Sequence, residues 1–366
     1  MSEPALPTVP AARYYDEYHG HKIRDLNLVH RVLRRDELEN EQQADLTTDP
    51  NTSTRGRPLI WTAGDSSLDN KFWFPDSAPS IGDYAQILSP PISVQDVTFW
   101  LNVITAEAGL PYAAINTAVE ATTLGSRCGG RLLDQDKFLR DNVRAEDVVV
   151  VSVGGNDIAL APAPCTVCNM LGLICCTPES CIEGARGQPL PCEDCCCGCG
   201  AGCASTCTAC PPCAGYFLHL FQTRLQLYIN SLTAKTRPKK ILVCMIYYPL
   251  EAPGGSWADC TLSLLGYNSN PGKLQLLIRK IFEMAVSQIR VKNCEVVPVP
   301  LFEFLDGKQR HDYVQRVEPS ADGGRKMATG LIEYIMRGQS QAAHDSSGAK
   351  YGGTSISTIP VSPMNA

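Results

Sequence analysis

Short apolar runs that alternate with helical stretches constrain the fold of this sequence most. The runs are β-branched or aliphatic and show little polar alternation, which is typical of strands buried on both faces of a parallel sheet. They cover residues 59–63, 112–115, 148–153, 241–246 and 296–299. Helical periodicity predicts helices near residues 93–108, 216–233, 272–290 and 324–337. The alternation therefore predicts a three-layer α/β/α sandwich with a five-stranded, mostly parallel sheet.

The chain divides by composition into three parts. Residues 1–57 are polar, carry one predicted helix near residues 23–42 and end in a turn-rich stretch, so we interpret them as an N-terminal extension and linker. Residues 58–338 are predicted to form the folded domain. Residues 339–366 are rich in Ser, Gly and Ala and are predicted to be disordered.

The totals favour a soluble globular protein that does not bind nucleic acid. Apolar residues make up 44% of the chain, and the formal net charge is −6. A negative chain has no general attraction for nucleic acid or an anionic membrane. No run approaches the roughly 20 apolar residues of a transmembrane helix. The N-terminus lacks the basic start and apolar run of a secretory signal, so we expect a cytoplasmic location.

Polar side chains follow two of the predicted strands at the point where each strand ends. The first strand runs into Gly64-Asp65-Ser66, and the third runs into the motif Gly-Gly-Asn156-Asp157. Because ligands bind at the carboxyl ends of strands in such sheets, we expect Ser66 and Asn156 to share one site. A hydroxyl next to an amide that can donate to an oxyanion is the equipment for acyl transfer.

These motifs resemble those of the SGNH (GDSL-type) serine-hydrolase family, and the resemblance spans about residues 59–337. It implies a flavodoxin-like fold and an esterase- or lipase-like hydrolase with no cofactor, acting on a small-molecule or lipid ester. By the same resemblance, Ser66 is the nucleophile. The oxyanion donors are the Ser66 N–H, the Asn156 amide and the N–H of Ala121, which stands where the family usually has Gly.

The last family motif is where the chain departs from the pattern. The family has Asp-x-x-His before Pro-Ser, whereas this chain has Gln315 in the Asp position and Glu318 in the His position. A solvated Glu has a pKa of about 4.3 and is a weak base for a serine hydroxyl. Burial can raise that pKa. His311, seven residues earlier, is a candidate substitute base, with an exposed loop histidine as the alternative interpretation.

Two functions therefore stay open from this site. The first is an ester hydrolase, weakened by the loss of the usual His, with Glu318 in the base position. The second is a catalytically silent SGNH-like protein that binds a ligand or serves in an assembly. The intact Ser66 and Asn156 favour the enzyme, and Glu318 with Gln315 favours the silent protein.

Cysteines are concentrated in one segment, residues 162–213, which we call the cysteine-rich insertion. The chain has 18 Cys, and 14 of them lie between Cys165 and Cys213. Without a secretory signal, a disulfide framework is not the first interpretation. Several Cys-x-x-Cys pairs have zinc-type spacing, but overlapping pairs around residues 195–197 make that spacing degenerate, and we assign no metal ligand.

Three interpretations of the cysteine-rich insertion remain: a metal site, S-acylation that tethers the protein to a membrane, and a plain loop insertion. The first two would make the protein a metal- or lipid-anchored adaptor, a third class of function. Because the insertion follows Asn156 closely in the chain, we expect it to form a lid or wall over Ser66.

Overall fold

The structure, a computed structural model, describes residues 8–16, 18–34, 57–194 and 200–337. The chain divides into two units, Met1–Ile335 and Met336–Ala366, and only the first two residues of the second unit are described. The tail that the sequence predicts to be disordered, residues 339–366, lies outside the described residues. So does the second half of the predicted first helix.

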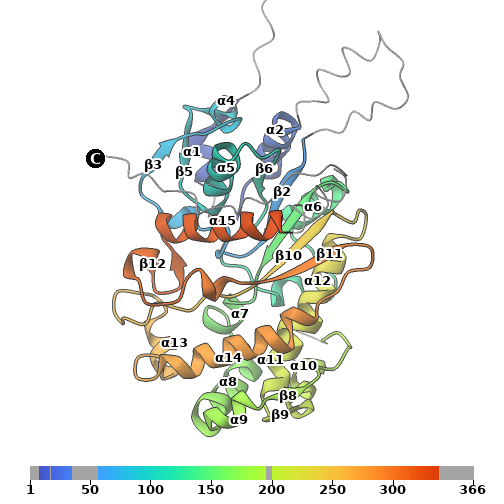
Figure 1. Ribbon diagram of the computed structural model, residues 1–366, viewed down its shortest axis with the longest axis vertical. Helices are drawn as coiled ribbons and strands as arrows, with labels where there is room; N and C mark the ends of the chain where they lie inside the picture. Colours follow the sequence, from blue (N-terminus) through green and yellow to red (C-terminus); the bar gives the residue numbers. More distant parts are fainter. Residues whose placement is uncertain (1–7, 17, 35–56, 195–199, 338–366) are drawn as a thin grey trace, which may run out of the picture. The chain divides into compact units, whose positions relative to one another are not determined.

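One parallel sheet forms the centre of the first unit (Figure 1). Its strands are β2 (Leu59–Gly64), β6 (Ala113–Asn116), β7 (Val148–Ser152), β10 (Lys240–Met245) and β11 (Glu295–Pro300). They lie in the order β11-β10-β7-β2-β6, and every neighbouring pair is parallel. The first four strands are buried along their whole length, which explains why they lack polar alternation.

Helices cover both faces of this sheet, as right-handed crossovers between parallel strands require. On one face, α5 (Val97–Glu107) and α15 (Ala321–Met336) are neighbours, and an arginine of α15 lies over a tryptophan ring of α5. On the other face, α6 (Asp134–Asn142) packs against α12 (Leu225–Leu232) and against α2 (Ile23–Leu33). The predicted α/β/α sandwich with a five-stranded sheet is confirmed, and the sheet is parallel throughout.

The described part of the N-terminal segment contributes to the core. Leu26 and Val29 of α2 are fully buried, and so is Val9, which precedes α1 (Ala11–Tyr15). Beyond α2, the buried Arg34 guanidinium donates to the Asp147 carboxylate at 2.5 Å. Composition alone gives no sign of this packing, because apolar residues are sparse in residues 1–57.

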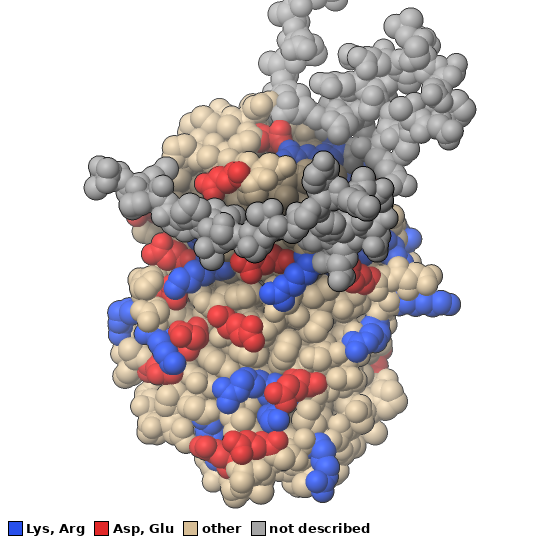
Figure 2. Space-filling view, in the orientation of Figure 1, with Lys and Arg blue, Asp and Glu red and all other residues tan. Residues whose placement is uncertain are grey.

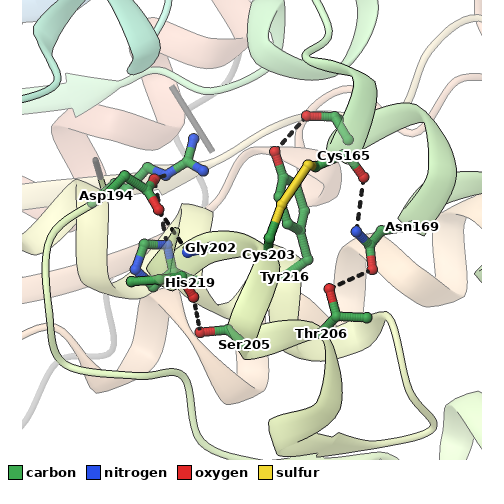
Figure 3. Close-up of a disulfide and its surroundings, with 12 residues drawn as sticks. Cys165, Asn169, Asp194, Gly202, Cys203, Ser205, Thr206, Tyr216 and His219 are labelled. Atoms are coloured by element: carbon green, nitrogen blue, oxygen red, sulfur yellow. Dashed lines mark hydrogen bonds and ion pairs between the residues drawn. A yellow bond between two sulfur atoms is a disulfide. The ribbon is translucent and has the colours of Figure 1, made fainter. Parts of the chain in front are cut away.

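The cysteine-rich insertion is folded into short elements after β7. It contains α8 (Pro164–Cys176), α9 (Glu179–Glu183) and α10 (Ala201–Ser205), together with a two-residue strand pair. A disulfide joins Cys165 of α8 to Cys203 of α10 (Figure 3). Because the N-terminus lacks a secretory signal, disulfides were not the first interpretation of these cysteines, and the cross-link differs from that prediction.

Four further elements complete the region that faces the insertion. The chain leaves the insertion through α11 (Ala214–Leu218) and a π-helical turn, η4 (His219–Arg224). Between β10 and β11 lie α13 (Asp259–Leu264) and α14 (Pro271–Met284). The helix α14 packs against α9 and α11 (Figure 1). Among the described residues, no helix combines the length and apolar character needed to cross a membrane.

Candidate active site

The turn that carries Ser66 depends on a close approach between two strand ends. Gly64 ends β2 with φ +133°, and a Cβ at this position would lie 1.7 Å from the carbonyl oxygen of Ser152 in β7. Only glycine allows this contact. The next residue, Asp65, donates its N–H to the same carbonyl at 3.0 Å. Ser66 therefore follows a fixed strand end, and its side chain is buried.

The Asp65 carboxylate joins the two strand-end turns. It accepts the Ser67 N–H at 3.0 Å, the Ser67 hydroxyl at 2.7 Å and the Gly154 N–H at 3.2 Å. Burial raises the pKa of Asp65, and these hydrogen bonds oppose that rise. The Ser67 hydroxyl also contacts the Ser152 hydroxyl at 2.6 Å. Because Ser67 is engaged in this way, Ser66 is the serine of the pair that is available for chemistry.

The Asn156 amide is oriented by the loop that follows β6. Its Nδ2 donates one hydrogen to the Thr122 carbonyl at 2.9 Å, and a carboxamide has a second hydrogen to give. The neighbouring Asp157 accepts the backbone N–H groups of Leu124 at 2.7 Å and Gly125 at 2.9 Å. Burial raises the pKa of Asp157 to about 6. The Gly-Gly-Asn-Asp turn is thus fixed to the same loop that carries Ala121.

Two backbone N–H groups are available beside this amide. Ala121 has φ +56°, a left-handed conformation that glycine adopts most easily. This conformation fits the Gly that is usual at this position in the family whose motifs the chain resembles. Within the described part of the chain, neither the Ala121 N–H nor the Ser66 N–H has a hydrogen-bond partner. Unpaired N–H groups of this kind are what an oxyanion requires.

Glu318 is a buried carboxyl that lines the same cavity as the candidate nucleophile. It begins β13 (Glu318–Pro319), and only 3% of its surface is exposed. Burial raises its pKa well above the usual value, and nearby carboxyls raise it further. Hydrogen bonds with the side chains of Ser66 and Trp257 act in the opposite direction. Its Oε2 has no hydrogen-bond partner among the described residues.

A second buried carboxyl, Glu120, lies near Glu318 and was not anticipated from the sequence. Burial raises the pKa of Glu120 to about 8, with the nearby Asp69 as the next cause. Among the described residues, its Oε2 also lacks a partner. Asp69 itself is paired with Lys71 at 2.6 Å and accepts the Glu120 N–H at 3.0 Å. Glu120 in turn helps to raise the pKa of Glu318.

No histidine of the described residues lines the cavity that contains Glu318. His311, the candidate substitute base, is 58% exposed and has its Nε2 3.3 Å from the Asp312 carboxylate. It is not among the residues that line the cavity at Ser66. His21 is buried, with its Nδ1 2.7 Å from the Tyr14 carbonyl, and burial lowers its pKa to about 3. Among the described residues, the cavity at Ser66 is thus lined by Glu318 and by no histidine.

Ser66, Asn156 and Glu318 all line one cavity, which contains about 950 Å³ of empty space with its open mouth included. Asp65 and Ser67 complete the polar rim. The remaining walls are mostly aliphatic and aromatic and come from β10, η4 and the helices α8, α13 and α14. The arrangement can hold an ester with its carbonyl at the rim and an apolar group in the interior.

The cysteines contribute a cross-link to one wall of this cavity. The side-chain carbonyl of Asn169 in α8 accepts the Thr206 hydroxyl at 2.9 Å, close to the Cys165–Cys203 disulfide (Figure 3). Among the described residues, no group of three or more His, Cys, Asp or Glu side chains is placed to hold a metal ion. Residues 195–199, which include four of the cysteines, lie outside the described residues.

Charges of both signs are interspersed over the described residues on the face of the molecule drawn in Figure 2.

Comparisons with known proteins find similarity in structure and none in sequence. No protein-family model matches the chain, and no curated protein matches it. A carbohydrate esterase of family 3 from Talaromyces cellulolyticus is 11% identical, with 79% of this chain and 100% of that chain covered and a TM-score of 0.36. The esterase EstA from Pseudoalteromonas sp. is 12% identical, with 77% of this chain and 98% of that chain covered and a TM-score of 0.38. The aryl esterase of M. smegmatis is 13% identical, with 76% of this chain and 98% of that chain covered and a TM-score of 0.36.

Proposed function

We propose that this protein is a serine ester hydrolase in which Ser66 attacks the acyl carbonyl and the Glu318 carboxylate accepts its proton. The observation that carries the proposal is that Ser66 and the buried Glu318 carboxyl line the same largely apolar cavity, with Ser66 close enough to lower the pKa of Glu318. Covalent catalysis needs a nucleophile with a base within reach of its proton, and this shared site provides both groups.

The acylation step uses groups already in place. Ser66 Oγ forms a bond to the carbonyl carbon as its proton moves to Glu318. The oxyanion accepts hydrogen bonds from the Ser66 and Ala121 N–H groups and from the free hydrogen of the Asn156 amide. Glu318 then gives its proton to the leaving alcohol as the C–O bond breaks. In the second half of the reaction, water bonds to the acyl carbon as Glu318 takes its proton, and Glu318 then gives that proton to Ser66 Oγ as the bond between Oγ and the acyl carbon breaks and the acid leaves.

The buried setting supports a carboxylate in the role of base. A solvated Glu is too acidic to draw a proton from a serine hydroxyl efficiently. A general base works best when its pKa lies near the working pH, and burial moves Glu318 in that direction. The same effect moves the ionisation of Glu318 to higher pH. We therefore expect a slow hydrolase whose rate rises with pH as Glu318 ionises.

A phosphonylating probe for activated serines tests the proposal. We expect a fluorophosphonate to label the wild-type protein at Ser66, and Ser66→Ala to abolish labelling and to lower p-nitrophenyl acetate hydrolysis by about 10⁴-fold or more. Ser67→Ala is the matched control and should still be labelled at Ser66. Circular dichroism checks that each variant is folded. Folded wild-type protein that takes up no probe at millimolar concentration would contradict the proposal and favour the silent binding protein.

A further inference from the structure

We propose that the cavity behind Ser66 binds the acyl chain of a medium- or long-chain fatty acyl ester, and that the cysteine-rich insertion limits the length of that chain. This inference rests on the proposed hydrolase function, because it takes Ser66 as the point where the carbonyl is held. It goes further by naming the substrate class and the residues that select it.

One helix presents a continuous apolar face to the cavity. Leu274, Leu277, Ile278 and Ile281 of α14 all line it, and each is 8% exposed or less. Their spacing of three and four residues places them on one side of the helix. An apolar face of this kind usually packs against a sheet or another helix. Here part of it faces empty space that leads to Ser66.

The opposite wall belongs to the cysteine-rich insertion and the segment after it. Met170 and Leu173 of α8 line the cavity, together with Phe217 of α11 and Phe221 of η4. All four side chains are buried. The acyl chain would therefore lie between α8 on one side and α14 on the other.

Polar contacts hold α8 in this position. The hydroxyls of Thr166 in α8 and Tyr216 in α11 are hydrogen-bonded at 2.6 Å, and Asn169 is bonded to Thr206 (Figure 3). The Cys165–Cys203 disulfide joins the same helix to α10. These contacts come from residues next to Met170 and Leu173 on the helix, so they hold the apolar side chains of α8 in position at the cavity.

A partition of three side chains lies between this cavity and a neighbouring one. Leu173, Leu277 and Ile281 line both this cavity and a second, smaller one of about 290 Å³. The second cavity is also apolar and is lined by side chains such as Ile182 and Met284. Removing side-chain volume from the partition would join the two spaces, and adding volume would shorten the first.

The distribution of polar groups fixes the direction of the substrate. The polar lining is concentrated at the rim, at Ser66, Asn156 and Glu318, and the depth of the cavity is aliphatic and aromatic. A fatty acyl ester matches this pattern, with its carbonyl at the rim and its chain inside. Each buried methylene should raise kcat/KM by about fourfold, the factor expected for transfer of one CH₂ from water, until the chain reaches the partition.

Chain-length profiles of p-nitrophenyl esters test the inference. For the wild type, kcat/KM should rise by about fourfold per methylene from acetate and then stop rising. Leu277→Trp should lower the ratio of decanoate to acetate kcat/KM by about 60-fold, the equivalent of three methylenes. Leu277→Ala should move the maximum to longer esters. Val167→Trp is the control, because Val167 lies on α8, is exposed and is not part of the lining.

A binding measurement separates failure of this inference from failure of the hydrolase proposal. Decanoate should bind to Ser66→Ala, which cannot turn over, and Leu277→Trp should weaken that binding in the same background. A flat chain-length profile with active Ser66 would overturn the acyl-chain site and leave the hydrolase standing. Decanoate that binds as predicted to a protein that hydrolyses no ester would overturn the hydrolase and leave a fatty-acid site. A change of profile in Val167→Trp as large as in Leu277→Trp would also overturn the inference.

Discussion

The rim of the sheet and the cysteine-rich insertion enclose the same cavity but are built in opposite ways. At the rim, buried carboxylates such as Asp65 and Asp157 accept several backbone N–H groups and connect turns that are distant in sequence. In the insertion, Met170 and Leu173 present apolar surface, and a disulfide with a few hydroxyl bonds holds the helix. The rim fixes directions of hydrogen bonds, whereas the insertion supplies volume and shape.

The difference indicates which part of the molecule sets which property. A hydrogen-bonded carboxylate positions its partners within tenths of an ångström, so changes at the rim should alter the rate of the chemical step. Apolar contacts are non-directional and scale with buried area, so changes in the insertion should alter which substrate is preferred. Substitutions at the rim that change only kcat, and substitutions in the insertion that change only the preferred chain length, would support this division. Substitutions that change both properties would contradict it.

The largest effect expected at the rim is from Glu318→Gln. Loss of the base should lower kcat by about 10²–10⁴-fold for short and long esters alike. The measurement is kcat and KM for p-nitrophenyl acetate and decanoate. The control is Glu303→Gln, which changes an exposed carboxyl in the short helical turn after β11. A Glu318→Gln variant that keeps its kcat within twofold of the wild type would remove Glu318 from the mechanism.

The same variant should gain stability at neutral pH. Because burial raises the pKa of Glu318 in the folded state, the folded protein keeps a proton that the unfolded chain loses above about pH 4.3. Wild-type stability is therefore lost as the pH rises from that value toward the folded pKa. Glu318→Gln removes the loss, so its advantage in unfolding free energy should grow by up to about 1.4 kcal/mol per pH unit across this window. Urea unfolding at several pH values measures it.

In the insertion, the corresponding test is removal of the disulfide. Replacing Cys165 and Cys203 by Ser opens a loop with a sequence separation of 38, which should lower the unfolding free energy by about 2–4 kcal/mol. Because α8 is then held less firmly, kcat/KM for decanoate should fall severalfold more than that for acetate. Cys168→Ser, an exposed free thiol of the same helix, is the control. An equal fall for both esters would show that the insertion also supports the chemical step.

The sequence predicted the rim far better than the insertion. Four fully buried strands and a partly buried fifth leave a plain apolar signature, and the position of Gly-Asp-Ser66 and Gly-Gly-Asn156-Asp157 directly after two of them predicts that both side chains lie at one edge. Such signals are local, because a strand and the turn that follows it are adjacent in the chain. The position of Glu318 was found through its neighbours, Pro319 and Ser320.

The remaining features depend on contacts between distant segments. Nothing near Glu120 in the sequence indicates that it is buried or that it lies close to Glu318, about 200 positions later. The cysteines suggested a metal site, S-acylation or a plain loop before a cross-link, and the pairing of Cys165 with Cys203 depends on how α8 and α10 meet. The apolar face of α14 was visible as a helical period, but whether it faces a sheet or a cavity is a tertiary property.

The smallest effect, and the most specific to the rim, is expected from Glu120→Gln. The negative charge of Glu120 disfavours ionisation of Glu318, so its removal should lower the pKa of Glu318. Since the ionised form of Glu318 is the base, the rising limb of the kcat profile should move to lower pH, by about 1 unit for a pair coupled this closely. Rates at the plateau and the chain-length profile should stay nearly unchanged.

Glu107→Gln, which changes an exposed carboxyl at the end of α5, controls for the loss of one charge. A limb that stays in place would mean that the two carboxyls titrate independently, and a limb that moves to higher pH would mean that Glu120 stabilises the Glu318 carboxylate through a shared proton.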